Sequence, residues 1–183
     1  MPESRRWYTE PETFVAVAAL IVSISAVVVG IYEASLQRQH DRNEVWPRLE
    51  IGTFTNGTKG ASIIVENTGI GPAIVESAVI TLDGKPQHGW GDIVEGIGGD
   101  SLGLSNYSIS GHGLRPGDQI TLVGIPASGT PHPFWEAIAR VGVTICYRSV
   151  FNERWIVESK RLGHGINWRD VDSCARQDTS ADF

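Results

Sequence analysis

The longest apolar run of the chain lies near its N-terminus. Residues 13–32 read TFVAVAALIVSISAVVVGIY, and no charged residue falls between Glu12 and Glu33. Twenty helical residues at about 1.5 Å each span about 30 Å, which is the thickness of the hydrocarbon core of a bilayer. The pattern predicts one transmembrane helix over residues 13–32, which follows an N-terminal tail of residues 1–12.

A cleaved leader is the main alternative to an anchor in this region. A signal peptide has a basic start and an apolar core of 7–15 residues. The run here is longer, and Glu3, Glu10 and Glu12 dilute the basic Arg5 and Arg6. We therefore expect an uncleaved single-pass anchor in the cell membrane, rather than a secreted β domain or a buried soluble helix. Basic residues are nearly equal in number on the two flanks, so the side of the membrane that holds the main domain stays open.

Small residues recur along one face of the predicted helix. They stand at steps of three, four, three and four: Ala16, Ala19, Ser23, Ala26 and Gly30. Small side chains let two helices approach closely, so this face is a candidate for self-association or for packing against a partner helix. The alternative is that the face meets only lipid.

The pattern changes twice after the apolar run. Residues 33–46 mix charges of both signs and contain no Gly or Pro, which predicts a juxtamembrane linker helix that ends before Pro47. Beyond Pro47, short runs rich in Val, Ile, Leu and Thr alternate with turn residues. The runs are 48–54, 61–65, 73–82, 119–124, 141–147 and 155–158. They predict a mainly β fold, an antiparallel sandwich over residues 47–176, followed by a flexible polar tail of residues 177–183.

Two short helices are expected within the sandwich, near residues 91–96 and 133–139. Asp83-Gly84 and Pro116-Gly117-Asp118 are turn signals between strands.

The stretch ENTGIGPAIVE, residues 66–76, raises the question of a phosphate-binding loop. A dinucleotide loop needs G-x-G-x-x-G between a strand and a helix. Here the third glycine is missing, and a strand-like run follows instead of a helix. We therefore interpret Gly69 and Gly71 as residues that supply positive φ in a turn, with Pro72 entering the next strand.

Three stretches together resemble a known group of proteins. They are QRQHDRNEVWPRLEI, VENTGIGPA and ICYRSVFNERW. The group consists of bacterial single-pass membrane proteins with an N-terminal anchor and an immunoglobulin-like sandwich. The resemblance covers most of the chain and implies that architecture, but it brings no activity with it.

The charge and the histidines restrict the classes of function. A net charge of −6 argues against a nucleic-acid surface, so no nucleic-acid partner is expected. The five histidines (His40, His88, His112, His132 and His164) show no metal-binding spacing, and no nucleophile elbow is present. We expect no cofactor and no catalysis. The alternative is a membrane-tethered enzyme or metal-dependent sensor that uses His and acidic residues from converging loops.

The two cysteines and the tryptophans are the remaining candidates for special roles. Cys146 and Cys174 would form a disulfide in an oxidising compartment and stay free thiols in the cytoplasm, and a redox pair is the third alternative. Trp90, Trp168 and Arg169 stand in expected loops, where they would contact a partner, although tryptophans also cap cores. The sequence thus favours a membrane-anchored, non-enzymatic binding or scaffolding module that presents a β-sandwich to a protein partner.

Overall fold

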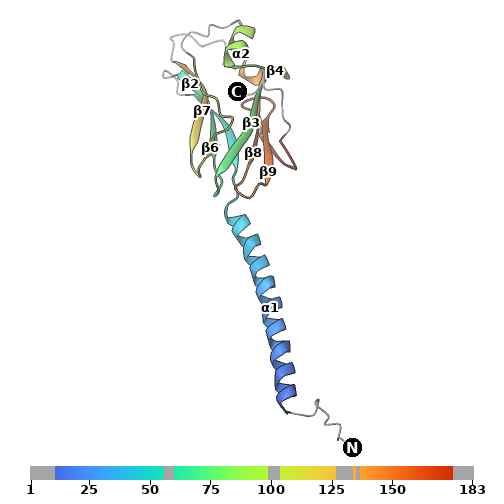
Figure 1. Cartoon of the computed structure of the whole chain (residues 1–183). Helices are drawn as coiled ribbons and strands as arrows, with labels where there is room; N and C mark the ends of the chain where they lie inside the picture. Colours follow the sequence, from blue (N-terminus) through green and yellow to red (C-terminus); the bar gives the residue numbers. More distant parts are fainter. Residues whose placement is uncertain (1–10, 56–59, 99–103, 127–133, 135–136, 175–183) are drawn as a thin grey trace, which may run out of the picture. The chain divides into compact units, whose positions relative to one another are not determined.

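The computed structural model describes residues 11–55, 60–98, 104–126, 134 and 137–174, and it divides into an N-terminal unit and a β unit (Figure 1). The N-terminal unit is one helix, α1 (Pro11–Glu44), which includes the predicted span and most of the predicted linker. It begins two residues before the predicted span and ends ahead of Pro47. Residues 1–10, which are most of the expected N-terminal tail, and residues 175–183, which include the expected C-terminal tail, lie outside the described residues.

Helix α1 is long and apolar enough to cross a membrane. Its candidate span is Pro11–Arg38, and none of the span's most apolar stretch is buried within the chain. The serine hydroxyls in the middle of the span need no water, since Ser23 donates to Leu20 O (2.9 Å) and Ser25 to Ile21 O (2.8 Å). The small-residue face lies on this helix, and its packing against another helix stays a prediction.

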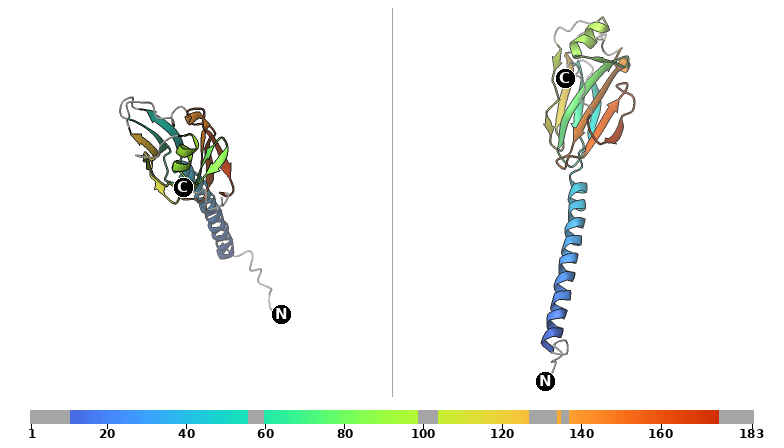
Figure 2. Two further views of the ribbon diagram at one scale, coloured as in Figure 1. Left: turned by 90° about the horizontal axis from the view of Figure 1, so that it is seen from above. Right: turned by 45° about the vertical axis from the view of Figure 1, so that its right-hand side comes forward.

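The β unit is a sandwich of two antiparallel sheets, as predicted (Figure 2). The smaller sheet has the strand order β1-β2-β7-β5, and the larger one has β10-β9-β8-β3-β4 with β6 also paired to β3. The strands of the smaller sheet are β1 (Leu49–Thr55), β2 (Gly60–Asn67), β7 (Gln119–Pro126) and β5 (Ser105–Asn106). Those of the larger are β3 (Ala73–Leu82), β4 (Lys85–Gln87), β6 (Gly113–Leu114), β8 (Val141–Arg148), β9 (Arg154–Ser159) and β10 (Asn167–Val171). The immunoglobulin-like relationship implied by the resemblance stays a prediction.

The core lies between the two sheets and follows the alternation of side chains along each strand. In β8, Val143, Ile145 and Tyr147 point into the core, whereas Cys146 lies on the outer face of the larger sheet. The six predicted strands all form, because each carries β-branched residues on its inner face. Four short or polar strands were not predicted, namely β4, β5, β6 and β10.

The predicted turns and the first short helix are confirmed. Asp83 and Gly84 both have positive φ (51° and 78°) in a two-residue hairpin between β3 and β4. Gly117 has φ 79° in the turn before β7. Helix α2 (Trp90–Gly96) forms where expected, and a 3-10 helix (Ile138–Arg140) lies at the end of the second predicted helical region, part of which falls outside the described residues.

Different elements meet at the two ends of the sandwich, which we call the entry end and the far end. The entry end holds the start of β1, the end of β2, the start of β3 and the turn from β8 to β9. The far end holds the turn from β3 to β4 and the start of β8, because Leu82 pairs with Val141 while Ile74 pairs with Arg148.

Candidate functional site

Asn67, the last residue of β2, is the centre of a buried polar cluster at the entry end. Its side chain is fully buried. The Oδ1 atom accepts hydrogen bonds from Arg48 N (3.2 Å) and Gly69 N (3.1 Å). The Nδ2 group donates to Gly71 O (2.8 Å) and Leu114 O (3.0 Å). One amide therefore joins three segments: the residues before β1, the loop 68–72 and strand β6.

The glycine loop uses its backbone N–H groups on the chain itself. Thr68 N donates to Arg48 O (2.8 Å), and both Ile70 N (3.0 Å) and Gly71 N (3.3 Å) donate to Trp46 O. Together with the bond from Gly69 N to Asn67, four consecutive N–H groups have acceptors within the protein. A phosphate-binding loop needs such groups to be free for the anion. The loop therefore holds residues 45–48, and its structural role is confirmed.

The predicted reason for the glycines is wrong. Neither Gly69 nor Gly71 has a positive φ. Instead, a Cβ at Gly69 would overlap the backbone of Trp46 to Arg48, and a Cβ at Gly71 would overlap the carbonyl of Val45. Glycine is required because two backbones pass in close contact. Pro72 directly precedes β3, which begins at Ala73.

Arg48 and Trp168 connect the two sheets beside this cluster. The guanidinium carbon of Arg48 lies 4.1 Å from the centre of the Trp168 ring, a cation–π distance, and its Nε is 3.4 Å from a Glu50 carboxylate oxygen. Trp168 Nε1 donates to Leu49 O (2.8 Å). Because Trp168 belongs to β10 and Leu49 to β1, this bond joins the edges of the two sheets.

Tyr147 makes a second connection between the sheets. Its hydroxyl lies 3.5 Å from Leu49 N, which donates to it, and its ring packs against Trp155 with centroids 5.8 Å apart. Burial raises the pKa of Tyr147 above its ordinary value of 10.0, because the phenolate would lose its hydration. The hydroxyl is therefore protonated at neutral pH.

The predicted contact residues do not form one surface. Trp90 is 1% exposed and packs edge-to-face against Phe134, so its expected role as a surface contact is wrong. Its position as the first residue of α2 turns it into the core. Trp168 is partly buried against the core, while the adjacent Arg169 is exposed on the opposite face of β10.

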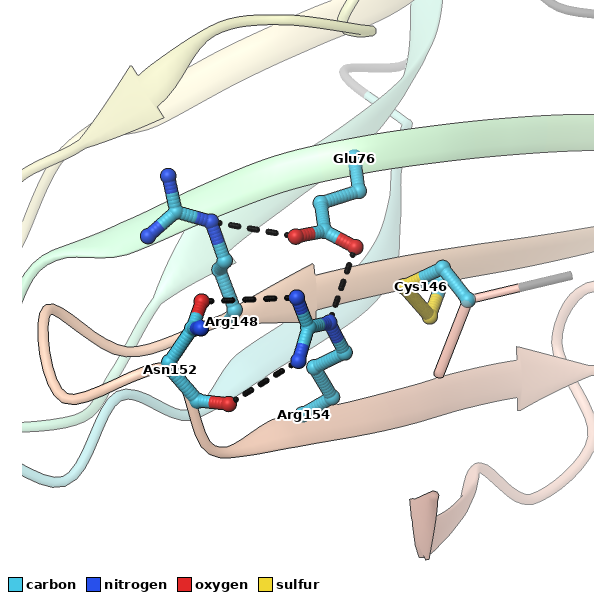
Figure 3. Close-up of a disulfide and its surroundings, with 6 residues drawn as sticks. Glu76, Cys146, Arg148, Asn152 and Arg154 are labelled. Atoms are coloured by element: carbon cyan, nitrogen blue, oxygen red, sulfur yellow. Dashed lines mark hydrogen bonds and ion pairs between the residues drawn. A yellow bond between two sulfur atoms is a disulfide. The ribbon is translucent and has the colours of Figure 1, made fainter. Parts of the chain in front are cut away.

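An ion network and a disulfide lie on the outer face of the larger sheet (Figure 3). Glu76 accepts from Arg148 Nε (3.0 Å) and Arg154 Nε (3.1 Å) through its two carboxylate oxygens. Arg154 also donates to the carbonyl and side chain of Asn152 in the turn between β8 and β9. Two cations share one carboxylate here, and the three side chains connect strands β3, β8 and β9.

Cys146 and Cys174 are joined by a disulfide that closes a separation of 28 residues. Cys146 is nearly buried on β8, and Cys174 follows β10. The bond therefore fastens the segment after β10 to the outer face of the larger sheet.

His112 and His164 lie at opposite ends of the sandwich. The backbone carbonyl of His112 accepts from Val75 N (2.9 Å) near the start of β3. His164 lies two residues after Leu162, whose N–H donates to Val141 O (2.9 Å) at the start of β8, at the far end. About seven residues of β3 separate these positions, or roughly 23 Å. Among the described residues no three His, Cys, Asp or Glu side chains gather as metal ligands. His132 lies outside them.

Sequence patterns did not reveal the role of Asn67 or of Glu76. The signal for Asn67 was present, because asparagine before a glycine turn often bonds to nearby backbone. Glu76, Arg148 and Arg154 gave no signal, since they meet only across three strands.

The chain matches no protein-family model and no curated protein sequence.

Proposed function

We propose that this chain is a single-pass membrane protein whose β-sandwich is a non-enzymatic binding module for a protein partner. The observation that carries the proposal is that the sandwich holds the residues directly after helix α1 by hydrogen bonds. Helix α1 ends at Glu44, and Val45 to Arg48 are held by the glycine loop and the buried Asn67. Such a junction suits a domain that must stay attached to an anchor.

The disulfide supports a position for the sandwich outside the cytoplasm. Disulfides persist in oxidising compartments and are reduced in the cytosol. The bond between Cys146 and Cys174 therefore favours the non-cytoplasmic face of the membrane. There the tether raises the local concentration of the sandwich, so that even a weak binder is effective near the bilayer.

The free edge of β1 is the surface that we propose for the partner. β1 pairs with β2 on one side, and at its start the other side is used by Trp168 and Tyr147. Successive backbone N–H groups of a strand point to opposite sides. Leu49 and Thr53 are four residues apart, so the N–H of Thr53 points to the same outer side as that of Leu49. Thr53 and Phe54 are exposed, and the described residues offer this edge no second strand. An extended partner segment can pair with such an edge.

Membrane extraction tests the anchor. The full chain should stay with membranes in alkaline carbonate and keep the mass of 183 residues. Val22→Arg combined with Val27→Arg should release it, because two charges near the centre of the span cost about 5–7 kcal/mol. Val22→Leu with Val27→Leu is the matched control. A shorter, soluble chain would show that the apolar run is a cleaved leader.

Crosslinking tests the partner surface. A photoreactive residue at Phe54 of the full chain, in its native membrane, should give one discrete crosslinked protein. Thr53→Pro should abolish that product, since proline removes an outward N–H that an edge strand does not otherwise need. Thr53→Val keeps the N–H and should preserve it. Equal products from both variants would contradict strand pairing.

A further inference from the structure

Exposed apolar side chains of the sandwich are concentrated at the entry end. Among the described residues after α1, six large hydrophobic side chains are exposed: Trp46, Phe54, Ile70, Tyr107, Val150 and Phe151. Four of the six belong to the entry end, with exposed fractions of 47% (Trp46), 63% (Ile70), 51% (Val150) and 43% (Phe151). Single exposed apolar residues are common, but a group at one end marks a contact surface.

The four residues share one end because of the topology. Ile70 lies in the glycine loop, and its N–H donates to Trp46 O (3.0 Å). Val150 and Phe151 form the tip of the turn that follows Arg148, which pairs with Ile74 at the start of β3. Figure 1 shows the turn between β8 and β9 at the end of the sandwich where the chain enters. We call Trp46, Ile70, Val150 and Phe151 the apolar rim.

The covalent connection keeps this rim close to the candidate membrane span. The last large apolar residue of α1 is Leu36, and the helix continues for eight residues to Glu44. At about 1.5 Å per residue this part is about 12 Å long. The headgroup layer on one side of a bilayer is roughly 5–8 Å thick. Trp46 follows Glu44 by two residues, which add at most about 7 Å, so the chain holds it no more than about 14 Å beyond the headgroup layer.

We infer that the entry end of the sandwich rests on the lipid surface, with the apolar rim in the interfacial region. This inference rests on the proposed membrane anchor. Tryptophan favours that region, and the apolar tips of two loops gain by leaving water. The occupant of the rim is therefore the bilayer, and the free edge of β1 stays available to the partner.

The charges at the entry end indicate that apolar contact supplies the attraction. Four arginines lie near the rim (Arg48, Arg115, Arg148 and Arg154), and so do six acidic residues (Glu50, Glu76, Asp118, Glu153, Asp170 and Asp172). With both signs present, the end has no cationic excess for anionic lipids. The contact should form on zwitterionic lipid and persist when salt is added.

Spin-label accessibility in lipid nanodiscs tests the inference on the full chain. Labels are placed separately at Val150→Cys in the rim, at Lys160→Cys near the far end and at Val22→Cys in the span, with the native disulfide kept oxidised. The expected result is loss of accessibility to a water-soluble nickel chelate at positions 22 and 150, in zwitterionic lipid with and without salt. Position 160 should stay accessible.

The three labels separate failure of the inference from failure of the anchor. If position 150 is as accessible to the chelate as position 160 while position 22 is protected, the anchor stands and the contact of the rim with lipid is wrong. If position 22 is itself accessible, the proposed anchor fails. Phe151→Ser combined with Ile70→Ser should restore chelate access at position 150, since it removes half of the rim.

Discussion

The side-chain oxygen of Asn67 accepts a hydrogen bond from the backbone N–H of Arg48, 19 residues earlier, at 3.2 Å. This contact joins the segment that follows helix α1 to the end of β2. The same amide bonds the glycine loop and β6, so the entry end depends on one buried side chain.

Asn67→Ala should destabilise the sandwich by about 3 kcal/mol. The substitution leaves four backbone groups without their partner, two in buried and two in partly buried hydrogen bonds, and an unsatisfied buried group costs about 1–3 kcal/mol. Urea unfolding of the full chain in detergent measures the loss. Thr68→Ala is the neighbouring control, since its exposed hydroxyl makes one long bond of 3.3 Å to Arg48 O. Equal stability of the two variants would contradict the role of Asn67.

Gly71→Ala should cost about 1–3 kcal/mol by forcing the loop away from Val45, as overpacking does elsewhere. The matched control is Gly165→Ala, because a Cβ there meets nothing within 4 Å and φ is not positive. Hydrogen exchange should show faster exchange at Ile70 and Gly71 in the first variant only. If both alanines are tolerated equally, close backbone approach is not why glycine stands at this position.

Removal of the disulfide should lower stability by about 3–4 kcal/mol, because the bond closes a loop of about 29 residues in the unfolded chain. The variant is Cys146→Ala with Cys174→Ala, compared with the parent by thermal unfolding. Reductant should destabilise the parent and leave the double variant unchanged. If the reductant also destabilises the double variant, its effect on the parent does not come from breaking the disulfide alone.

Tyr147 should make the sandwich sensitive to alkaline pH. Its pKa is raised in the folded state, so above about pH 10 the unfolded chain ionises first and stability falls as pH rises toward the folded pKa. The steepest contribution of one group is about 1.4 kcal/mol per pH unit. Tyr147→Phe should therefore lose stability less steeply between pH 10 and 11. If the stability of the parent and of this variant falls equally steeply with pH, Tyr147 is not the cause of the alkaline sensitivity.

The strands could be predicted from the sequence where burial dictates the pattern. The run Ala73–Leu82 was predicted with both of its ends, because its apolar residues fill the core on one face and part of the outer layer on the other. Strand β10 was not predicted, since Asn167, Arg169 and Asp170 are polar and its position depends on pairing with β9.

The candidate site was less predictable because its parts meet only in space. The glycine loop was rightly separated from phosphate-binding loops, but the demand for glycine comes from a segment about 25 residues earlier. The exposure expected for Trp90 was wrong because α2 turns that residue into the core. The sequence shows that a tryptophan is present, whereas packing decides whether its side chain lies in the core or on the surface.

Cysteine labelling in intact cells tests the central claim most directly. The claim is that an anchored sandwich stands on the oxidising side of the membrane with Cys146 bonded to Cys174. A membrane-impermeant thiol reagent should label the unfolded chain only after external reduction. Labelling only after lysis, with no reductant needed, would place free thiols in the cytoplasm and contradict the proposed topology.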